Sequence, residues 1–411
     1  MKTQSSVQNG FYGLGIAPAL LDALSRLRFT TPTPIQQRSI PLAIEGKDMI
    51  GVAQTGTGKT LAFGVPMIQR LAQIKGKGLV ILPTRELALQ VDEVLSRVGN
   101  SLGLRTAVLI GGASMHMQLA AIRKNPHIVV ATPGRLIDHL NQKNLTLVNT
   151  KILVLDEADR MLDMGFLPQI KKIFEAVPKE RQTMLFSATI PAEIMRIASS
   201  YMKLPVQIEV APSGTTVERV THEIFVVPKE AKIRLLQKIL SENRGSTLVF
   251  TRTKHGARRV KKSLTALGHG SAEIHSNRSL SQRREALEGF RSGRYRVLVA
   301  TDIAARGIDV RGIELVINYD LPSTPEDYVH RIGRTGRAGS GGHAISFVTP
   351  EERNEVRRIE RLIRKTIPVT ALPADLPQAP VLPAGNFRQD DFRSPRRDFR
   401  GPGHFRSRRR Y

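Results

Sequence analysis

The stretch Ala53-Gln-Thr-Gly-Thr-Gly-Lys-Thr60 decides the fold expected of this chain. It follows the apolar segment Met49–Val52 and precedes Leu61-Ala-Phe-Gly64, which predicts a strand, a glycine-rich turn and a helix in that order. This order places backbone N–H groups around a phosphate at a helix N-terminus. Lys59 can then reach the β- and γ-phosphates, and the Thr60 hydroxyl can ligate Mg²⁺.

The match to the general phosphate-loop pattern is not complete, because Ala53 stands where the pattern begins with glycine. By average composition, such a string arises by chance in roughly 3 of 100 chains of this length. On this motif alone, an ordinary strand-to-helix turn stays open as an alternative. The expected nucleotide-binding residues are Ala53, Gln54, Thr55, Gly56, Thr57, Gly58, Lys59 and Thr60.

Composition narrows the class of protein. A chain of 411 residues with 41% hydrophobic content can build two or three packed domains. Its 62 basic and 36 acidic residues give a formal charge of +26, which attracts polyanions such as nucleic acid or an anionic membrane surface. No run reaches the ~18 apolar residues of a membrane span, and the polar N-terminus lacks a signal-peptide core. The absence of cysteine excludes disulfides and thiolate metal sites, and we expect a cytoplasmic protein.

Apolar, strand-like runs alternate with longer helix-like stretches over residues 48–350, a pattern typical of parallel α/β architecture. The chain also repeats itself. The run that begins at Leu79 resembles the run from Leu248, and the run ending at Thr132 resembles that ending at Thr301, each at an offset of 169 residues. One shared offset predicts two copies of one domain. The second copy has no Gly-Lys-Thr after its 248–250 run, so we expect a single nucleotide site that the second domain completes.

Breaker residues and changes in composition mark the expected boundaries. We expect a first domain at 1–210, a linker at 211–218, a second domain at 219–368 and a tail at 369–411. Residues 386–411 hold nine Arg, three Asp and four Phe, which is typical of a disordered basic tail. Such a tail can raise affinity for nucleic acid and stack phenylalanines on exposed bases, although a solubility appendage stays open as an alternative.

An acidic cluster follows a second apolar run. Residues 151–155 predict a buried parallel strand, and Asp156-Glu-Ala-Asp159 stands at its C-terminal end, where doubly wound sheets bind ligands. Asp156 suits Mg²⁺ directly or through water, and Glu157 can orient and deprotonate the water that attacks the γ-phosphate. By itself the cluster could be a solvated helix start. The phosphate loop upstream favours the catalytic interpretation.

A second dense cluster is Tyr328-Val-His-Arg-Ile-Gly-Arg-Thr-Gly-Arg-Ala-Gly339. Arg331, Arg334 and Arg337 recur every three residues among glycines, and glycine costs ~1 kcal/mol inside a helix, which argues against a merely solvated face. Guanidinium groups from a second domain would stabilise charge on a transferring phosphoryl group. Contact with RNA phosphates stays open as an alternative, at least for Arg331.

Together these motifs resemble those of DEAD-box RNA helicases, and specifically the compact bacterial RhlE-like group, from about Phe11 to Ile367. The resemblance implies an α/β fold of two tandem RecA-like parallel-sheet domains with a disordered basic C-terminal tail. Pro32-Thr-Pro-Ile-Gln36 is similar to the adenine-sensing Q motif, with Phe11 placed 25 residues before Gln36. The resemblance implies that Gln36 reads the adenine edge and that Phe11 stacks on the base.

The resemblance also implies roles that spacing alone does not assign. Ser187-Ala-Thr189 is similar to the motif that couples hydrolysis to strand separation, and His330 would link it to the arginine cluster. Asp309 is expected to hold the ribose hydroxyls. The implied catalytic residues are Lys59, Asp156, Glu157, Arg334 and Arg337, the coupling residues Ser187, Ala188, Thr189 and His330, and the RNA-binding residues Arg85, Gly112, Thr132, Arg135, Arg252, Arg283 and Thr301.

Two positions depart from the family pattern. Arg28 stands before Phe29 where the family usually has glycine, so the backbone near the Q motif is expected to differ locally. Leu280 replaces the glutamine of the family's Gln-x-x-Arg element, which leaves Arg283 alone and puts its RNA role in doubt.

The resemblance implies an RNA-stimulated ATPase that unwinds short RNA duplexes or remodels RNA–protein complexes, with ATP and Mg²⁺ as cofactors. RNA is the expected partner, held through its backbone with little sequence preference. We also expect a monomer that works in ribosomal or RNA-decay assemblies and has no membrane partner. Two rivals stay open: a DNA-dependent translocase, and an RNA-binding or annealing protein without enzymatic activity.

Overall fold

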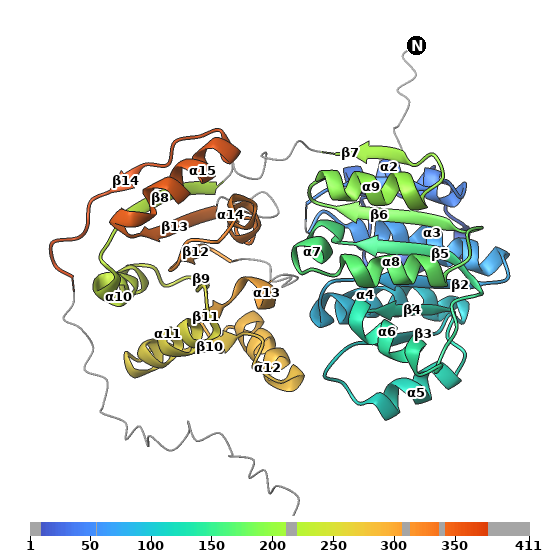
Figure 1. The fold of residues 1–411 in the computed structure, drawn as a ribbon, viewed down its shortest axis with the longest axis horizontal. Helices are drawn as coiled ribbons and strands as arrows, with labels where there is room; N and C mark the ends of the chain where they lie inside the picture. Colours follow the sequence, from blue (N-terminus) through green and yellow to red (C-terminus); the bar gives the residue numbers. More distant parts are fainter. Residues whose placement is uncertain (1–9, 55, 211–219, 306–312, 337–341, 377–411) are drawn as a thin grey trace, which may run out of the picture.

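Two parallel sheets make up the part of the chain that the structure describes. The computed structural model describes residues 10–54, 56–210, 220–305, 313–336 and 342–376. Each sheet has seven strands, ordered β3-β4-β2-β5-β6-β1-β7 in the first and β10-β11-β9-β12-β13-β8-β14 in the second. Helices flank each sheet in its own half of the molecule (Figure 1). The expected fold of two tandem α/β domains is confirmed.

The first domain begins with two helices before its first strand. Its strands are β1 Met49–Val52, β2 Lys77–Ile81, β3 Thr106–Leu109, β4 Ile128–Ala131, β5 Thr150–Asp156, β6 Gln182–Ser187 and β7 Val206–Glu209. Its α-helices are α1 Pro18–Arg26, α2 Pro34–Ile44, α3 Lys59–Gln73, α4 Arg85–Gly99, α5 Met115–Arg123, α6 Pro133–Asn141, α7 Ala158–Asp163, α8 Leu167–Ala176 and α9 Ala192–Tyr201. The short 3₁₀ helix η1 spans Asn100–Leu102.

The second domain follows the same plan. Its strands are β8 Val220–Val226, β9 Thr247–Phe250, β10 Ser271–Ile274, β11 Val297–Ala300, β12 Leu315–Asn318, β13 Gly342–Val348 and β14 Val369–Thr370. Its α-helices are α10 Lys232–Glu242, α11 Lys254–Ala266, α12 Leu280–Arg291, α13 Asp302–Ala305, α14 Pro325–Ile332 and α15 Arg353–Ile363. The 3₁₀ helices are η3 Lys229–Ala231 and η4 Pro350–Glu352.

The central strands are buried on both faces because helices cover both sides. β1 and β11 are apolar and buried at every position, as parallel strands between two helical layers must be. Side-chain caps fix where several helices begin: the Thr84 hydroxyl accepts a hydrogen bond from the Leu87 amide at the start of α4. Of the helices in the described residues, none is both long enough and apolar enough to cross a membrane.

The two strand orders superimpose element by element, which confirms the internal repeat and corrects one detail of it. β2 corresponds to β9 and β4 to β11, as the offset predicts, but the strand that corresponds to β1 is β8. The counterpart of the phosphate loop is therefore the turn after β8, and not the turn after β9 where the sequence comparison placed it. That turn is the helix η3, and α10 begins at Lys232 as α3 begins at Lys59.

The described residues at the domain ends extend the second sheet beyond its expected limit. β7 ends at Glu209 and β8 begins at Val220, on either side of the expected linker, which itself lies outside the described residues. β14 pairs with β8, and Leu372 and Leu376 pack against the core of the second domain. The second domain thus includes residues up to 376, eight beyond the expected boundary, because this short strand completes the sheet edge. The Arg-rich segment 386–411 lies outside the described residues.

Candidate functional site

The phosphate loop has the geometry that its glycines suggest. Gly56 and Gly58 have φ angles of 87° and 90°, in the left-handed region that glycine adopts without strain. A Cβ on Gly58 would lie only 2.3 Å from the Gln36 amide nitrogen, so a larger residue cannot replace it without displacing Gln36. Ala53 does not have a positive φ and its Cβ is tolerated. Thr55 lies outside the described residues.

Lys59 and the acidic cluster meet at the C-terminal edge of the first sheet. Lys59 donates hydrogen bonds to the Ala53 carbonyl at 3.1 Å and to Glu157 Oε1 at 3.2 Å, and its Nζ lies 3.9 Å from Asp156 Oδ1. Asp156 ends β5, and Glu157 follows it with a φ of 56°. A left-handed glutamate is strained, and such strain is typical of functional sites. Thr60 is half-buried in the first turn of α3.

Burial and the surrounding cations set the charge states of this cluster. Burial raises the pKa of Asp156 to about 6, although Lys59 opposes the rise. Burial also disfavours ionised Glu157, but Arg160 and Lys59 outweigh it and hold the pKa of Glu157 below its usual range. Burial tends to lower the pKa of Lys59, yet Glu157 and Asp156 raise it above normal. The cluster therefore holds an ionised Glu157 beside a charged Lys59 at neutral pH.

Gln36 connects the start of the chain to the phosphate loop. Its side-chain amide donates to the Gly58 carbonyl at 2.9 Å, and its oxygen accepts from the Thr33 amide at 2.9 Å, in the capping box that opens α2. Phe11 is buried in the core of the first domain. Arg28 has a φ of 62°, in the left-handed region that glycine adopts without strain. The expected local difference near the Q motif is therefore strain at Arg28, and the backbone still takes the conformation that a glycine would allow.

The expected coupling residues Ser187, Ala188 and Thr189 gather around Asp159. Asp159 Oδ2 accepts hydrogen bonds from the Ala188 amide at 3.1 Å and from the Thr189 amide and hydroxyl at 2.9 Å each. The Asp159 amide donates to the Ser187 hydroxyl at 3.2 Å. The segment after β6 is thus fixed to the acidic cluster by the aspartate that ends it.

His330 reaches this cluster from the second domain. Its Nδ1 lies 3.5 Å from Nη2 of the fully buried Arg160, whose Nε lies 3.2 Å from Glu157 Oε2. Burial and the neighbouring Arg160 lower the pKa of His330 to about 4, so the imidazole is neutral at physiological pH. His330 therefore lies beside the acidic cluster, and its connection to the expected coupling residues runs through Arg160 and Asp159.

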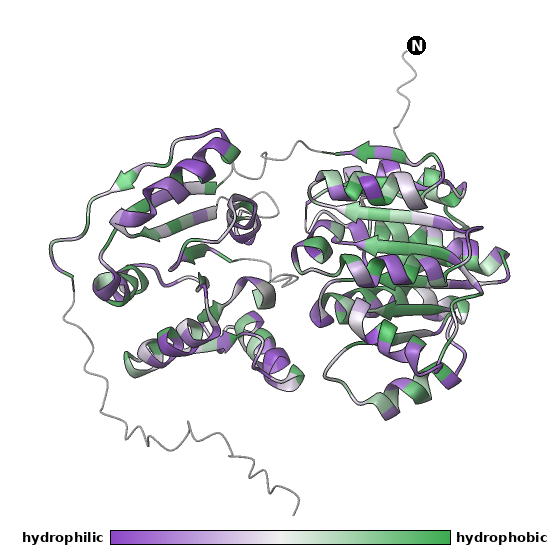
Figure 2. Cartoon of the chain, in the orientation of Figure 1, coloured by the Kyte–Doolittle hydropathy of each residue, from purple (hydrophilic) through white to green (hydrophobic). Residues whose placement is uncertain are grey.

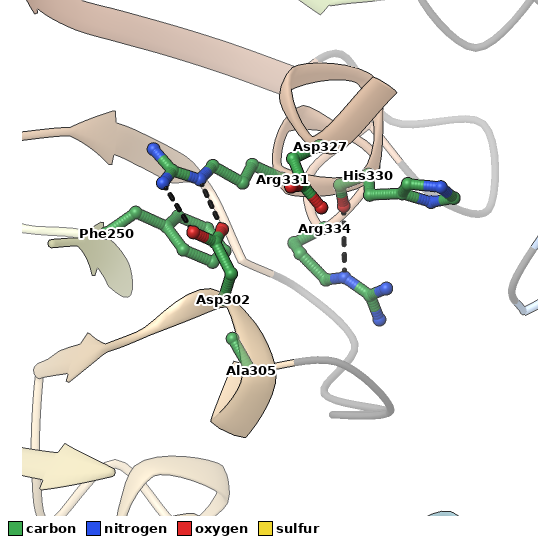
Figure 3. Close-up of a pocket in the computed structure, with 7 residues that line it drawn as sticks. All are labelled: Phe250, Asp302, Ala305, Asp327, His330, Arg331 and Arg334. Carbon is green, nitrogen blue, oxygen red and sulfur yellow. Dashed lines mark hydrogen bonds and ion pairs between the residues drawn. The ribbon is translucent and has the colours of Figure 1, made fainter. Parts of the chain in front are cut away.

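The arginines of the second cluster take different places. Figure 3 shows Arg331 and Arg334 on either side of a small pocket with Asp302. Arg331 binds Asp302 with two hydrogen bonds at 2.6 and 2.8 Å and stacks 4.9 Å above the Phe250 ring, so it supports the fold of the second domain. Arg334 donates to the His330 carbonyl at 3.3 Å, and its charge helps to lower the pKa of Glu157. Arg337 and Asp309 lie outside the described residues.

Residues of both domains line one hollow of about 400 Å³, called here the interdomain hollow. Among the expected RNA-binding residues, it is lined by Arg85, Thr132, Arg135 and Arg283. Gly112 lies against Arg85, because a Cβ on it would be 2.2 Å from Arg85 Nη1. Thr301 lies directly after β11, which leads to Ala304 in the lining. Arg252 lies in a separate hollow of the second domain and bonds Glu352 at 3.1 Å.

Arg283 also bridges the two domains. Its Nη2 donates to Glu86 Oε2 at 2.8 Å, and both side chains are buried. Leu280, three residues earlier on α12, packs against the core cluster of the first domain. The replacement of a polar residue by Leu280 therefore adds an apolar contact at the same boundary.

The comparisons with known proteins agree with this geometry. A family model described as DEAD/DEAH box helicase matches residues 33–197, and one described as Helicase conserved C-terminal domain matches residues 231–339. The DEAD-box ATP-dependent RNA helicase CshA of Bacillus cereus is 43% identical over 358 residues, which cover 86% of this chain and 68% of the relative. The chain belongs to the DEAD-box family of ATP-dependent RNA helicases.

Further relatives place this helicase in a wide family. The ATP-dependent rRNA helicase RRP3 of Yarrowia lipolytica is 42% identical over 87% of this helicase and 75% of its own length. Among solved structures, S. cerevisiae Dbp5 bound to RNA and ADP BeF3 has a TM-score of 0.78 at 32% identity, with 89% and 96% of the two chains covered. Mss116p bound to ssRNA and AMP-PNP has a TM-score of 0.80 at 28% identity, with 87% and 78% covered.

A dead-box protein from Methanococcus jannaschii is more similar in sequence but less similar in shape. It is 36% identical over 88% of this helicase, yet its TM-score is 0.52. The higher scores belong to the two relatives whose structures hold RNA and a nucleotide analogue. In overall shape this helicase is therefore more similar to those two complexes than to the Methanococcus jannaschii protein.

Three residues of the site escaped the sequence analysis. The sequence motifs assign no role to Asp159, which ends the acidic cluster, or to Arg160 and Glu86. Their partners are the expected coupling segment, His330 and Arg283, which lie 28 or more residues away along the chain. The signal in the sequence is the residue type. A charged side chain directly before or after an apolar strand or motif indicates that a partner of opposite charge or a hydrogen-bond donor lies nearby in the fold.

Proposed function

We propose that this helicase hydrolyses ATP at a site that both domains complete, and that it uses the hydrolysis cycle to open short RNA duplexes or to remodel RNA–protein complexes. One observation carries the proposal: side chains of both domains converge on Glu157. Lys59 and Arg160 approach it from the first domain, and His330 and Arg334 influence its charge from the second. A carboxylate surrounded in this way can respond to closure of the two domains.

The phosphate loop is proposed to bind the triphosphate of ATP. Gly56, Thr57 and Gly58 would present backbone N–H groups at the start of α3, where the helix dipole favours an anion. Lys59 would exchange its bonds to Ala53 and Glu157 for the β- and γ-phosphates. Gln36, already bonded to Gly58, supports adenine recognition next to the loop. The proposed ATP-binding residues further include Phe11, Ala53, Gln54, Thr55, Thr60 and Asp309.

The donor set at this edge fits Mg²⁺. Asp156 contributes a buried carboxylate and Thr60 a hydroxyl, both of them oxygen donors of the kind that Mg²⁺ prefers, and phosphates and water can supply the rest. When bound, Mg²⁺ would neutralise charge that develops on the phosphoryl oxygens. The raised pKa of Asp156 supports this role, because burial disfavours its ionised form and a bound cation would offset that cost.

Glu157 is proposed to orient and deprotonate the attacking water. Its lowered pKa keeps it ionised, and the bond from Lys59 positions the carboxylate before ATP binds. Arg334 and Arg337 would stabilise the γ-phosphate in the transition state. A Cβ on Gly333 would lie 3.9 Å from Gln54 Oε1, which supports a second-domain contact with the phosphate loop. Hydrolysis would reach the RNA side through Asp159, Ser187, Ala188, Thr189 and His330.

RNA is proposed to bind in the interdomain hollow, held by its backbone. Arg85 and Arg135 would contact phosphates from the first domain, and Arg283 from the second. Gly112, Thr132 and Thr301 complete the proposed track, and Arg252 extends it on the second domain. A strand held by two domains in a bent path cannot stay in a regular A-form duplex, so its complement dissociates. Hydrolysis would reopen the domains and release the RNA.

We also propose a subgroup, an oligomeric state, a domain division and a cellular setting, from the sequence and from the residues that make up the site. We assign the helicase to the RhlE-like group from its motif spelling and Arg-rich tail. Because one chain supplies both halves of the site, we propose a monomer as the working unit. We keep the four-part division of the chain, with the second domain extended to residue 376, and the proposal that this helicase works in the cytoplasm on ribosomal or RNA-decay assemblies.

ATP turnover with different nucleic acids tests the proposal. Turnover is measured without nucleic acid, with single-stranded RNA, with duplex RNA and with DNA of the same sequence. We expect turnover to rise with RNA and to stay near the RNA-free rate with DNA. Equal stimulation by DNA would favour a DNA translocase, and no turnover under any condition would favour a non-enzymatic RNA-binding protein. An isolated first domain that turns over ATP at the full rate would refute the shared site.

A further inference from the structure

Helix α11 carries an unusual surplus of positive charge. The helix reads Lys-His-Gly-Ala-Arg-Arg-Val-Lys-Lys-Ser-Leu-Thr-Ala, with five basic residues and no acidic residue. Its inner face, which includes Ala257, Val260 and Leu264, is buried in the second domain. On the outer face Arg258 and Lys262 are exposed and Lys261 is half-buried. Figure 2 shows a helix that is hydrophilic over much of its length. We call Arg258, Lys261 and Lys262 the α11 basic face.

The charges of the α11 basic face are not neutralised within the described residues. None of the three cations forms an ion pair with a carboxylate in this part of the chain. Glu273, on the adjacent strand β10, is already bonded to Arg278 and lies 3.5 Å from His275. Arg258 and Lys262 stand four residues apart, as do Lys254 and Arg258, and like charges at this spacing destabilise a helix. An anionic partner bound to this face would relieve the repulsion between its positive charges.

The helix that carries this face begins near the edge of the interdomain hollow. α11 starts two residues after Arg252, and its first residue, Lys254, donates to Asn277 Oδ1 at 3.2 Å. Asn277 follows Ser276, which lines the interdomain hollow. Lys254, Arg258 and Lys262 then repeat every four residues, an axial rise of about 6 Å each. A line of cations therefore leads away from the hollow along the outside of the second domain.

We propose that the α11 basic face binds the phosphate backbone of RNA that extends beyond the interdomain hollow, and so holds the double-helical arm next to the strand being opened. This inference rests on the proposed function, because it assumes that RNA occupies the hollow. Lys and Arg on a helix supply the sequence-independent part of nucleic-acid affinity, and each phosphate contact adds to its salt dependence. The α11 basic face would therefore favour RNAs that carry a double-helical arm, whatever their base sequence.

Helix α15 provides a matched control. Arg357, Arg358 and Arg361 are exposed and have the same four-residue span as Arg258, Lys261 and Lys262, of which Lys261 is half-buried. α15 packs through Ile359 and Ile363 in a core cluster with β8, whereas α11 contacts β10 and β11 near the other edge of the sheet. Figure 1 shows the two helices at opposite sides of the second domain. Three positive charges can therefore be removed either from α11, near the interdomain hollow, or from α15, on the opposite side of the domain.

The test uses two triple variants of the full chain: Arg258→Gln/Lys261→Gln/Lys262→Gln on α11 and Arg357→Gln/Arg358→Gln/Arg361→Gln on α15. Glutamine removes the charge and keeps helix propensity. Binding in the presence of a non-hydrolysable ATP analogue is measured with two fluorescent probes: a short oligouridylate, and the same oligouridylate joined to an RNA hairpin. Affinity is measured over a range of salt concentrations, and thermal unfolding is measured without RNA.

For the α11 variant and the hairpin probe, we expect the slope of log affinity against log salt to fall by about 2 to 3, since about 0.7–0.9 is lost per phosphate contact. Affinity should fall at least about tenfold at 0.1 M salt. The oligouridylate without the hairpin and the α15 variant should show much smaller changes. The thermal midpoint of the α11 variant should stay equal or rise, because like-charge repulsion is relieved. If these residues stabilise the fold, the thermal midpoint of the variant would fall instead.

Two outcomes would overturn the inference. An α11 variant that binds the hairpin probe as the wild type does would show that the face makes no RNA contact. Equal losses in the α11 and α15 variants would show that only net charge matters. A wild-type protein that binds neither probe would defeat the proposed function itself, and that result is distinct from both.

Discussion

The ion pair between Glu86 and Arg283 gives the sharpest prediction, because it joins the two domains inside the interdomain hollow. The perturbation is Glu86→Gln, which keeps the shape of the side chain and removes its charge. The bond of 2.8 Å would be replaced by a neutral contact, and Arg283 would stay buried beside Arg85, whose charge repels it. The variant thus leaves a guanidinium in place with its counter-charge removed.

The magnitude follows from burial. Glu86 and Arg283 are 5% and 8% exposed, so solvent screens the pair poorly. Removal of one partner from a buried pair costs about 3–5 kcal/mol. The adjoining hollow of about 400 Å³ can admit water to the guanidinium, so we take the lower end. About 3 kcal/mol corresponds to a factor of roughly a hundred in an equilibrium constant. Because the pair spans the domains, this cost falls on their closed arrangement and not on either domain alone.

The assay is RNA-stimulated ATP turnover as a function of RNA concentration, together with the distance between dyes placed on the two domains. For Glu86→Gln we expect the half-saturating RNA concentration to rise about a hundredfold. The control is Glu93→Gln on the same helix, where the pair with Arg97 spans 4.0 Å and is solvent-exposed, so little change is expected. An unchanged half-saturating concentration in Glu86→Gln would refute the contribution of the pair to closure. Tighter RNA binding would show that Glu86 competes with RNA phosphates for Arg283.

Four further predictions concern the nucleotide site and its surroundings. Lys59→Ala removes the cation held between Ala53 and Glu157, so nucleotide affinity should be lost, and unchanged affinity in a fluorescent-nucleotide titration would exclude this site. Glu157→Gln should bind ATP and RNA but turn over at least about a hundredfold more slowly, whereas wild-type turnover would remove Glu157 from the role of base. Because the pKa of Asp156 is raised to about 6, affinity for Mg²⁺-nucleotide should be constant above pH 6 and fall about tenfold per unit below it, and a flat profile from pH 5 to 8 would contradict this role. Arg28→Gly relieves a left-handed backbone and should stabilise the first domain by about 0.5–1 kcal/mol in chemical denaturation, after the entropy cost of glycine, while Arg26→Gly at the end of α1 should destabilise it.

The parts of the site that the sequence predicts are those built by adjacent residues. The phosphate loop and the acidic cluster need particular residue types at fixed spacings, because backbone turns, a lysine and carboxylates must meet one triphosphate. Gly58 illustrates this dependence, since it needs both a positive φ and an open side toward Gln36. The double sheet follows in the same way from the alternation of apolar runs and from the internal offset.

The parts that the sequence did not predict depend on partners from distant segments. Asp159 meets the expected coupling residues 28 to 30 positions away, and Arg160 meets His330 170 positions away in the other domain. Nothing in the spacing of charged residues indicates such pairs. The repeat also misplaced the counterpart of the phosphate loop, because β2 and β9 have kept similar sequences while β1 and β8 have not. Only the order of strands in the two sheets shows that the counterpart follows β8.

The turn after β8 has a consequence for how many nucleotides one chain binds. Lys232 stands at the start of α10 as Lys59 does at the start of α3, but its ammonium donates to the Tyr319 carbonyl at 2.9 Å and lies 3.4 Å from Asp320. Lys232 thus bonds within its own domain, and the turn before it, residues 227–231, has none of the glycines that would bring backbone N–H groups around a phosphate. Binding stoichiometry should therefore be one nucleotide per polypeptide.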